Sequence, residues 1–231
     1  TMELGGHAPV IIARDADLSK VVPLAAEWKF RNAGQVCVSP TRFLVEAPLY
    51  DDFVSGMAEA AEKITVGNGA DPATTMGPLA SSAQFDKIQD LIGDAIDKGA
   101  RVATGGARIG NQGWFFAPTI LADMTTEMRA MNEEPFGPLA LVTKVNDLDA
   151  ALAEANRIPV GLAAYAFTGD SETRHRIVSD IKSGMLGVNH FAMAMPETPF
   201  GGVLDSGLGS EGGIEGIQAY LTPFTVTAKE H

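Results

Sequence analysis

Ala8-Pro9-Val10-Ile11-Ile12-Ala13 is an apolar, largely β-branched run, and a helical pattern follows it over residues 17–28. A run without alternating polar positions predicts a strand that is buried on both faces. Asp17 is a typical N-cap residue, and the apolar residues after it recur at the spacing of one helix face. Pro23 lies inside this pattern and predicts a kink or a later helix start. The stretch therefore predicts one β–α unit.

The same alternation continues along the chain. Further strands are predicted over 41–46, 102–104, 115–121, 139–145, 163–167 and 185–188, and further helices over 49–64, 82–98, 148–156 and 172–181. Ser81 or Ser82 caps the second of these helices and Gly99 ends it. Strands that alternate with amphipathic helices imply βαβ units. The predicted fold class is α/β, a three-layer α/β/α arrangement with a mainly parallel sheet.

The pattern changes near the C-terminus. A glycine-rich loop over 199–213 leads into a short helix and then into an alternating, β-prone segment over 222–227. No crossover helix follows this last predicted strand, so it is free to pair with another domain or another subunit.

Composition excludes several classes of protein. The 231 residues are 45% apolar and 20% charged, which describes an ordinary globular chain, and the length suits one large domain. A net charge of −12 argues against a nucleic-acid partner. No apolar run approaches the roughly 18 residues of a membrane span, so no membrane partner is expected. A single cysteine cannot form an internal disulfide, and a cytoplasmic setting is therefore expected.

Cys37 is that single cysteine, and Glu3 lies upstream of it. A thiolate is a strong nucleophile, and a positioned carboxylate can deprotonate the water that clears an acyl-enzyme. The residue type alone favours a small buried side chain instead. Arg31, six residues before Cys37, could lower the pKa of the thiol or hold an anionic substrate, or could simply form a surface ion pair.

Three other local patterns carry both a structural and a functional interpretation. The first is a rigid turn that presents Glu134 and Phe136, in the segment Glu133-Glu134-Pro135-Phe136-Gly137-Pro138. The second exposes an aromatic ring beside glycines, in Pro199-Phe200-Gly201-Gly202. The third, residues 206–213, superficially looks like a phosphate-binding glycine loop. The last lacks the strand, helix and distant acid of a dinucleotide fingerprint. The four histidines show no metal-ligand spacing, so no metal site is expected.

Taken in order, five segments resemble the motifs of the NAD(P)-dependent aldehyde dehydrogenase superfamily. They are Glu3-Leu4-Gly5-Gly6, Gly34-Gln35-Val36-Cys37, Glu134-Pro135-Phe136-Gly137-Pro138, Pro199-Phe200-Gly201-Gly202 and Ser206-Gly207-Leu208-Gly209-Ser210-Glu211-Gly212. The resemblance spans essentially the whole chain. It implies residues 1–214 as the catalytic domain and residues 215–231 as a helix end and a bridging strand of a homo-oligomer.

The resemblance also implies roles for individual residues. Cys37 would attack the aldehyde, Glu3 would activate the water that hydrolyses the thioester, and the backbone N–H of Cys37 would form half of an oxyanion hole. Leu4, Gly5, Glu134 and Phe136 would contact the NAD or NADP cofactor. Phe200 would line the aldehyde channel, and Glu211 would assist proton movement.

Glu3 implies that water is the acyl acceptor, so the product would be a carboxylic acid. Arg31 and the Pro196-Glu197-Thr198-Pro199-Phe200 run resemble those of succinate-semialdehyde dehydrogenases, in which such an arginine binds the substrate carboxylate. Met195 stands where some of these enzymes have a serine for the same carboxylate. The cofactor-binding N-terminal domain of the family is missing from this chain, which is therefore expected to be inactive alone.

Two alternatives remain open. Cys37 could work with His190 in a cofactor-independent thiol hydrolase or transferase, or the chain could be a non-catalytic assembly module in which Cys37 is a remnant. Loss of esterase activity on His190→Ala would favour the first, and rapid alkylation of Cys37 at neutral pH would contradict the second.

Overall fold

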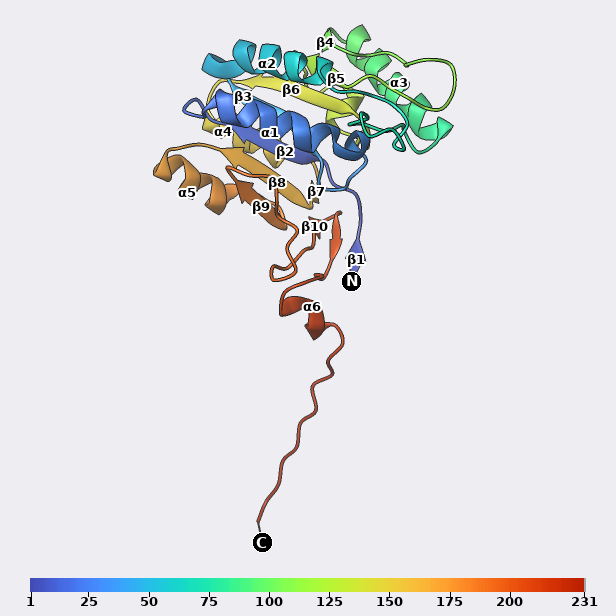
Figure 1. Cartoon of the computed structure of the whole chain (residues 1–231). Helices are drawn as coiled ribbons and strands as arrows, with labels where there is room; N and C mark the ends of the chain where they lie inside the picture. The colour runs from blue at the N-terminus through green and yellow to red at the C-terminus, as the bar shows by residue number, and fades with distance from the viewer. Residues whose placement is uncertain (231) are drawn as a thin grey trace.

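A seven-stranded sheet forms the centre of the molecule in the computed structural model, which describes residues 1–230 (Figure 1). Every neighbouring pair in this sheet is parallel except the pair at one edge, β4 and β5. In spatial order the strands are β4 (Arg101–Thr104), β5 (Thr119–Ala122), β6 (Leu139–Val145), β3 (Pro40–Glu46), β2 (Ala8–Ile12), β8 (Ala163–Phe167) and β9 (Met185–Val188). The predicted mainly parallel sheet is confirmed.

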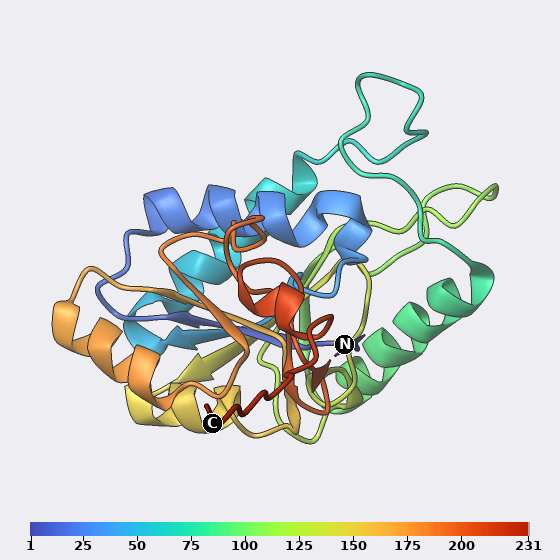
Figure 2. The same cartoon turned by 90° about the horizontal axis from the view of Figure 1, so that it is seen from below.

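Helices cover both faces of this sheet (Figure 2). α1 (Leu18–Phe30) and α2 (Tyr50–Glu62) lie on one face, and α3 (Ser82–Asp97), α4 (Leu148–Ala155) and α5 (Ser171–Asp180) lie on the other. β2 shows why: Val10 and Ile12 pack into the core under α1 and α2, whereas Ile11 packs under α4 and α5. The three-layer α/β/α arrangement follows from strands that are apolar on both faces.

α1 begins at Leu18 and runs through Pro23 to Phe30 as one helix, so the alternative of a later start is wrong. Asp17 caps it by accepting a hydrogen bond from the Ser19 N–H at 3.1 Å. Pro23 has no backbone N–H, so the carbonyl of Ser19 lacks its usual helical donor. Ser19 is exposed, and water can bond to this carbonyl instead.

Two small antiparallel sheets attach the glycine-rich C-terminal loop to the rest of the fold. β1 (Met2–Glu3) pairs with β11 (Gly207–Leu208), and β7 (Val160–Gly161) pairs with β10 (Val203–Leu204). Buried Ser206 joins them, because its hydroxyl donates to the Gly5 carbonyl at 2.8 Å and accepts from the Gly161 N–H at 3.0 Å. Three single 3-10 turns complete the fold: η1 (Arg31–Gly34), η2 (Ala47–Leu49) and η3 (Arg129–Met131).

The C-terminal end differs in part from the expectation. The short helix is present as α6 (Glu215–Gln218), whereas residues 222–227 form no strand within this single chain. These residues are exposed and extend away from the body of the molecule (Figure 1). A strand requires a hydrogen-bonded neighbour, and none is offered within residues 1–230. Pairing with another subunit stays a prediction.

Candidate active site

Cys37 lies in the loop between η1 and β3, and the backbone around it is tightly constrained. Asn32, Ala33 and Gly34 adopt left-handed φ values of 52°, 53° and 68° in succession. A side chain on Gly34 would collide with the Gly137 carbonyl, so this position requires glycine. Beyond the cysteine, the carbonyl of Val38 accepts a hydrogen bond from the hydroxyl of Tyr165 at 2.7 Å. The loop is therefore fixed on both sides of a half-buried thiol.

The surroundings of the thiol do not make it a thiolate by themselves. Burial raises the pKa of Cys37 above its ordinary value, and the carboxylates of Glu134 and Glu3 raise it further. The backbone N–H groups of Val38 and Cys37 act in the opposite direction. The effect of Arg31 on this pKa stays a prediction.

Glu3 is brought near Cys37 from the other end of the site by its pairing with Gly207 in the β1–β11 sheet. Burial raises the pKa of Glu3, and the negative charge of Glu211 raises it further. Glu211 is held by two backbone hydrogen bonds of 2.7 Å with Phe200. A carboxyl with a raised pKa beside a thiol suits a group that takes up and releases a proton.

Glu134 lies against the Glu3-Leu4-Gly5-Gly6 turn. Its Oε1 accepts from the Gly6 N–H at 3.2 Å, and a Cβ on Gly5 would come within 2.5 Å of its Oε2. Burial raises the pKa of Glu134. Within residues 1–230 Oε2 accepts no hydrogen bond, so it is available to a ligand hydroxyl such as that of a ribose. Gly5 and Glu134 thus fit the cofactor expected here.

The surroundings of Leu4 and Phe136 do not show by themselves that these residues contact a cofactor. The side chain of Leu4 is exposed. Phe136 is half-buried in a turn with a φ of 48°, and its carbonyl accepts from the Gln84 side chain at 3.0 Å. No hydrogen bond joins either residue to Cys37 in the part of the chain that the structure describes.

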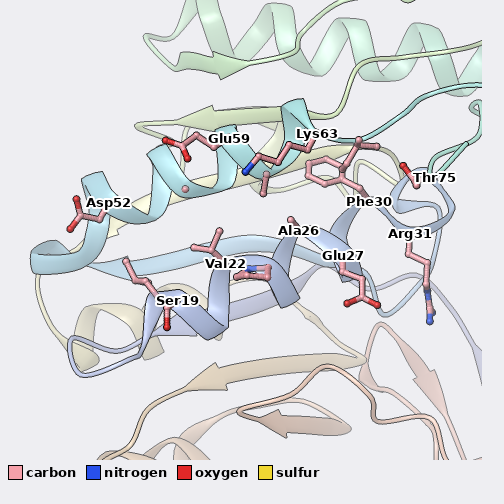
Figure 3. Close-up of a pocket in the computed structure, with 15 residues that line it drawn as sticks. Ser19, Val22, Ala26, Glu27, Phe30, Arg31, Asp52, Glu59, Lys63 and Thr75 are labelled. Atoms are coloured by element: carbon pink, nitrogen blue, oxygen red, sulfur yellow. The ribbon is translucent and has the colours of Figure 1, made fainter. Parts of the chain in front are cut away.

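Arg31 and Phe200 line the same small cavity, as the proposal of a common substrate channel requires. Its volume is about 120 Å³, and its wall includes Val38, the residue after Cys37. A larger groove of about 810 Å³ lies between α1 and α2 (Figure 3), but none of Cys37, Glu3 and Glu134 lines it. Arg31 lines both spaces and Cys37 lines neither, but Val38 and Phe200 line only the small cavity, which is therefore the candidate aldehyde site.

The structure also shows residues that local sequence patterns did not indicate. Tyr165 holds the Cys37 loop from a strand 127 positions away in the sequence, and Ser206 fastens the Glu3 segment. Lys29 is fully buried beside this loop and donates to the Ser39 hydroxyl at 3.3 Å. In residues 1–230 no three His, Cys, Asp or Glu side chains gather as a metal site would require, and no helix is long and apolar enough to cross a membrane.

The whole chain can now be compared with known proteins. A sequence model described as the aldehyde dehydrogenase family matches residues 1–226. The chain belongs to the aldehyde dehydrogenase family.

Three relatives of this aldehyde dehydrogenase chain illustrate the similarity. It is 45% identical over 221 residues to 4-(hydroxymethyl)benzenesulfonate dehydrogenase TsaD1 of Comamonas testosteroni, and 42% identical over 221 residues to 3-sulfolactaldehyde dehydrogenase of Pseudomonas putida. Each alignment covers 96% of this chain and 46% of the relative. The crystal structure of succinate-semialdehyde dehydrogenase from Burkholderia pseudomallei superposes with a TM-score of 0.93 at 40% identity, covering 95% of this chain and 46% of that one. The chain thus spans about half the length of these relatives.

The alternative that pairs Cys37 with His190 gains no support from the geometry. His190 is exposed at the end of β9, and no hydrogen bond links it to Cys37 within residues 1–230. The two carboxylates Glu3 and Glu134 are the titratable neighbours that influence the thiol.

Proposed function

We propose that this chain is the catalytic portion of an NAD(P)-dependent aldehyde dehydrogenase that oxidises an anionic aldehyde to a carboxylic acid. The observation that carries the proposal is the convergence of Cys37, Glu3 and Glu134 from three separate segments, since both carboxylates act on the pKa of the thiol. A nucleophile, a base and a hydroxyl-binding carboxylate are the parts that this chemistry needs.

In the proposed mechanism the Cys37 thiol first loses its proton to solvent water. The thiolate sulfur then forms a bond to the aldehyde carbon as the carbonyl π bond breaks, and the carbonyl oxygen becomes an oxyanion beside the backbone N–H of Cys37. A nicotinamide, when bound, would accept the hydride that the former aldehyde carbon loses, so that the oxyanion re-forms a carbonyl and a thioester remains on Cys37. Glu3 then takes a proton from water as that water attacks the thioester, the carbon–sulfur bond breaks, and the thiolate and a carboxylic acid are released. Glu211 lies where it can raise the proton affinity of Glu3. Glu134 and Gly5 would hold the cofactor ribose, with Leu4 and Phe136 beside it.

The substrate class is proposed from Arg31 and from the relatives. The compounds in the relatives' names are 4-(hydroxymethyl)benzenesulfonate, 3-sulfolactaldehyde and succinate semialdehyde, and each carries a sulfonate or a carboxylate. Arg31 supplies a guanidinium at the cavity that is also lined by Val38, the residue after Cys37. Succinate semialdehyde is proposed among these because Arg31 and the Pro196-Glu197-Thr198-Pro199-Phe200 run are similar to those of succinate-semialdehyde dehydrogenases.

Several finer points are proposed with it. Either NAD or NADP serves as cofactor, the setting is cytoplasmic, and residues 1–214 form the catalytic domain. Because about half of each relative has no counterpart here, this chain alone should not form NADH from an aldehyde and NAD. Appreciable NADH formation by the purified chain would overturn this point.

Acyl transfer can be tested without the cofactor. On incubation with p-nitrophenyl acetate, the Cys37 thiolate should displace p-nitrophenolate, and Glu3-assisted hydrolysis should then release acetate. Glu3→Gln should slow the second step by about 10²–10⁴-fold. Mass spectrometry should therefore show that the variant accumulates one acetyl group on Cys37, whereas Cys37→Ala shows none.

His190→Ala is the matched control for this experiment, because it removes the base of the rival mechanism. It should release p-nitrophenol at the wild-type rate. If His190→Ala abolishes turnover while Glu3→Gln turns over normally, the thiol hydrolase replaces the proposal.

The proposed homo-oligomer depends on the C-terminal segment. Tyr220, Phe224 and Val226 are 86%, 89% and 71% exposed, which leaves an apolar, unpaired segment in solution. We expect removal of residues 222–231 to convert an oligomer into a monomer in sedimentation experiments. Phe224→Asp should weaken association in the same direction, and Thr222→Ser should not. A full chain that sediments as a monomer at all concentrations contradicts the bridging role.

A further inference from the structure

Arg31 has no acidic partner among residues 1–230, yet its side chain is held in one place. Its guanidinium carbon lies 4.5 Å from the centre of the Trp28 ring. Trp28 lies in the last turn of α1 and Arg31 follows the end of that helix, so the contact joins two residues that are close in the chain. A planar guanidinium stacks well on an indole, and this contact leaves its N–H groups free for an anion.

Trp28 in turn rests on a rigid aromatic cluster. Its ring lies 6.3 Å from that of Phe191 at an interplanar angle of 26°. Buried Phe191 contacts Tyr165 at 4.7 Å and Phe167 at 5.1 Å between ring centres. Packed aromatic rings lose little freedom when a ligand binds, so the indole is a preorganised support.

The same aromatic cluster is hydrogen-bonded to the loop that carries Cys37. Tyr165 of this cluster donates its hydrogen bond to the carbonyl of Val38, directly after Cys37. Trp28, Arg31, Val38, Phe191 and Phe200 all line the small cavity. An anion held by Arg31 would therefore lie in a cavity whose wall includes Val38, the residue after Cys37.

The negative net charge means that an anionic substrate needs a positive side chain close to the cavity. A net charge of −12 repels anions from the protein as a whole, so selection of an anionic substrate must come from a fixed nearby cation. We propose that Trp28 is a specificity-determining positioning residue, which holds the Arg31 guanidinium at the cavity so that Cys37 reacts preferentially with compounds carrying a carboxylate or sulfonate. This inference rests on the proposed function, because Arg31 is its proposed anion-binding residue.

Charge-selective thiol reagents test the inference on the chain itself. A thiolate attacks a methanethiosulfonate at its sulfenyl sulfur, forming a disulfide as methanesulfinate leaves, and Cys37 is the only cysteine that can react. The measured quantity is the rate constant for the 2-sulfonatoethyl reagent divided by that for the neutral methyl reagent. Dividing this ratio by the same ratio for 2-mercaptoethanol, which carries no charge besides its thiolate, removes differences in intrinsic reactivity.

We expect this normalised ratio to exceed one for the wild type. Trp28→Leu should lower it about two- to fivefold, as expected for loss of one exposed cation–π contact. Arg31→Ala should lower it at least about fivefold. Trp28→Phe, which keeps a ring, should retain most of the preference. Lys20→Ala, which removes an equal charge from the exposed face of α1, should leave the ratio unchanged.

The possible outcomes distinguish failure of the role of Trp28 from failure of the proposed anionic substrate class. If Arg31→Ala leaves the ratio unchanged, the anionic substrate class itself fails. If Arg31→Ala lowers the ratio but Trp28→Leu leaves it at the wild-type value, only the role of Trp28 fails. An unchanged rate with the neutral reagent shows that the Cys37 loop is intact in each variant. If Trp28→Leu does not fold, the role of Trp28 is tested with Trp28→Phe. A normalised ratio for Trp28→Phe as low as that of Arg31→Ala overturns the inference.

Discussion

Glu154→Ala is expected to lower the free energy of unfolding of this chain by about 3 kcal/mol. Glu154 sits at the end of α4, and its carboxylate lies 3.2 Å from the guanidinium of Arg42, whose side chain is fully buried in β3. Removing the carboxylate leaves a buried positive charge without its counter-ion, and the backbone carbonyls of His7, Glu154 and Ala155 that also accept from Arg42 cannot neutralise it.

Arg157 adds to the effect, because it donates to the same carboxylate at 2.6 Å and to the carbonyl of Met131 at 3.2 Å. Thermal denaturation should show a melting temperature lower by roughly 6–12 °C for a chain of this size. Glu133→Ala is the matched control, since its 2.8 Å pair with Arg129 is about half exposed on both sides. Such pairs contribute only about 0–1 kcal/mol. Equal losses in the two variants would contradict a special role for the buried pair.

Most of the sheet could be predicted because its signal is local. β6 and β9 begin and end where the apolar runs predicted them, and α3 begins after the Ser81 cap. The run over 115–121 forms a strand only at Thr119–Ala122, because pairing with β6 starts at Thr119. Residues 222–227 have β-prone alternation but lack a neighbour, and the sequence of one chain does not reveal where that neighbour is.

The candidate site was less accessible to prediction from local patterns. Glu3, Cys37 and Glu134 were found through the order of their motifs, since no spacing rule joins residues so far apart. Tyr165 and Ser206 act on the site through hydrogen bonds between distant segments, and each looks locally like an ordinary strand or loop residue. Lys29 occupies an apolar face of α1, where a lysine normally marks the solvent side. Only the folded packing shows that its charge is buried.

The second large effect is expected from Lys29→Met, which should change how stability depends on pH. Burial lowers the pKa of Lys29 from 10.5 to about 7, although the negative charge of Glu134 acts in the opposite direction. Between these two values the unfolded chain binds a proton that the folded chain does not. The contribution of Lys29 to stability is therefore fully present above about pH 10.5, falls as the pH is lowered, and reaches its minimum near pH 7.

The size of the pH dependence follows from the single proton that Lys29 binds in the unfolded chain. Wild-type stability should gain up to about 1.4 kcal/mol per pH unit from Lys29 as the pH rises from 7 toward 10, and Lys29→Met should remove this slope. Urea denaturation at several pH values measures it, with Lys29→Met more stable than the wild type near pH 7 and losing that advantage at higher pH. Lys20→Met, on the exposed face of the same helix, should keep the wild-type slope. Parallel curves for wild type and Lys29→Met would contradict this prediction. They would mean that the attraction of Glu134 and the hydrogen bond to the Ser39 hydroxyl keep Lys29 charged in the folded chain, so that burial is not the dominant influence on its pKa.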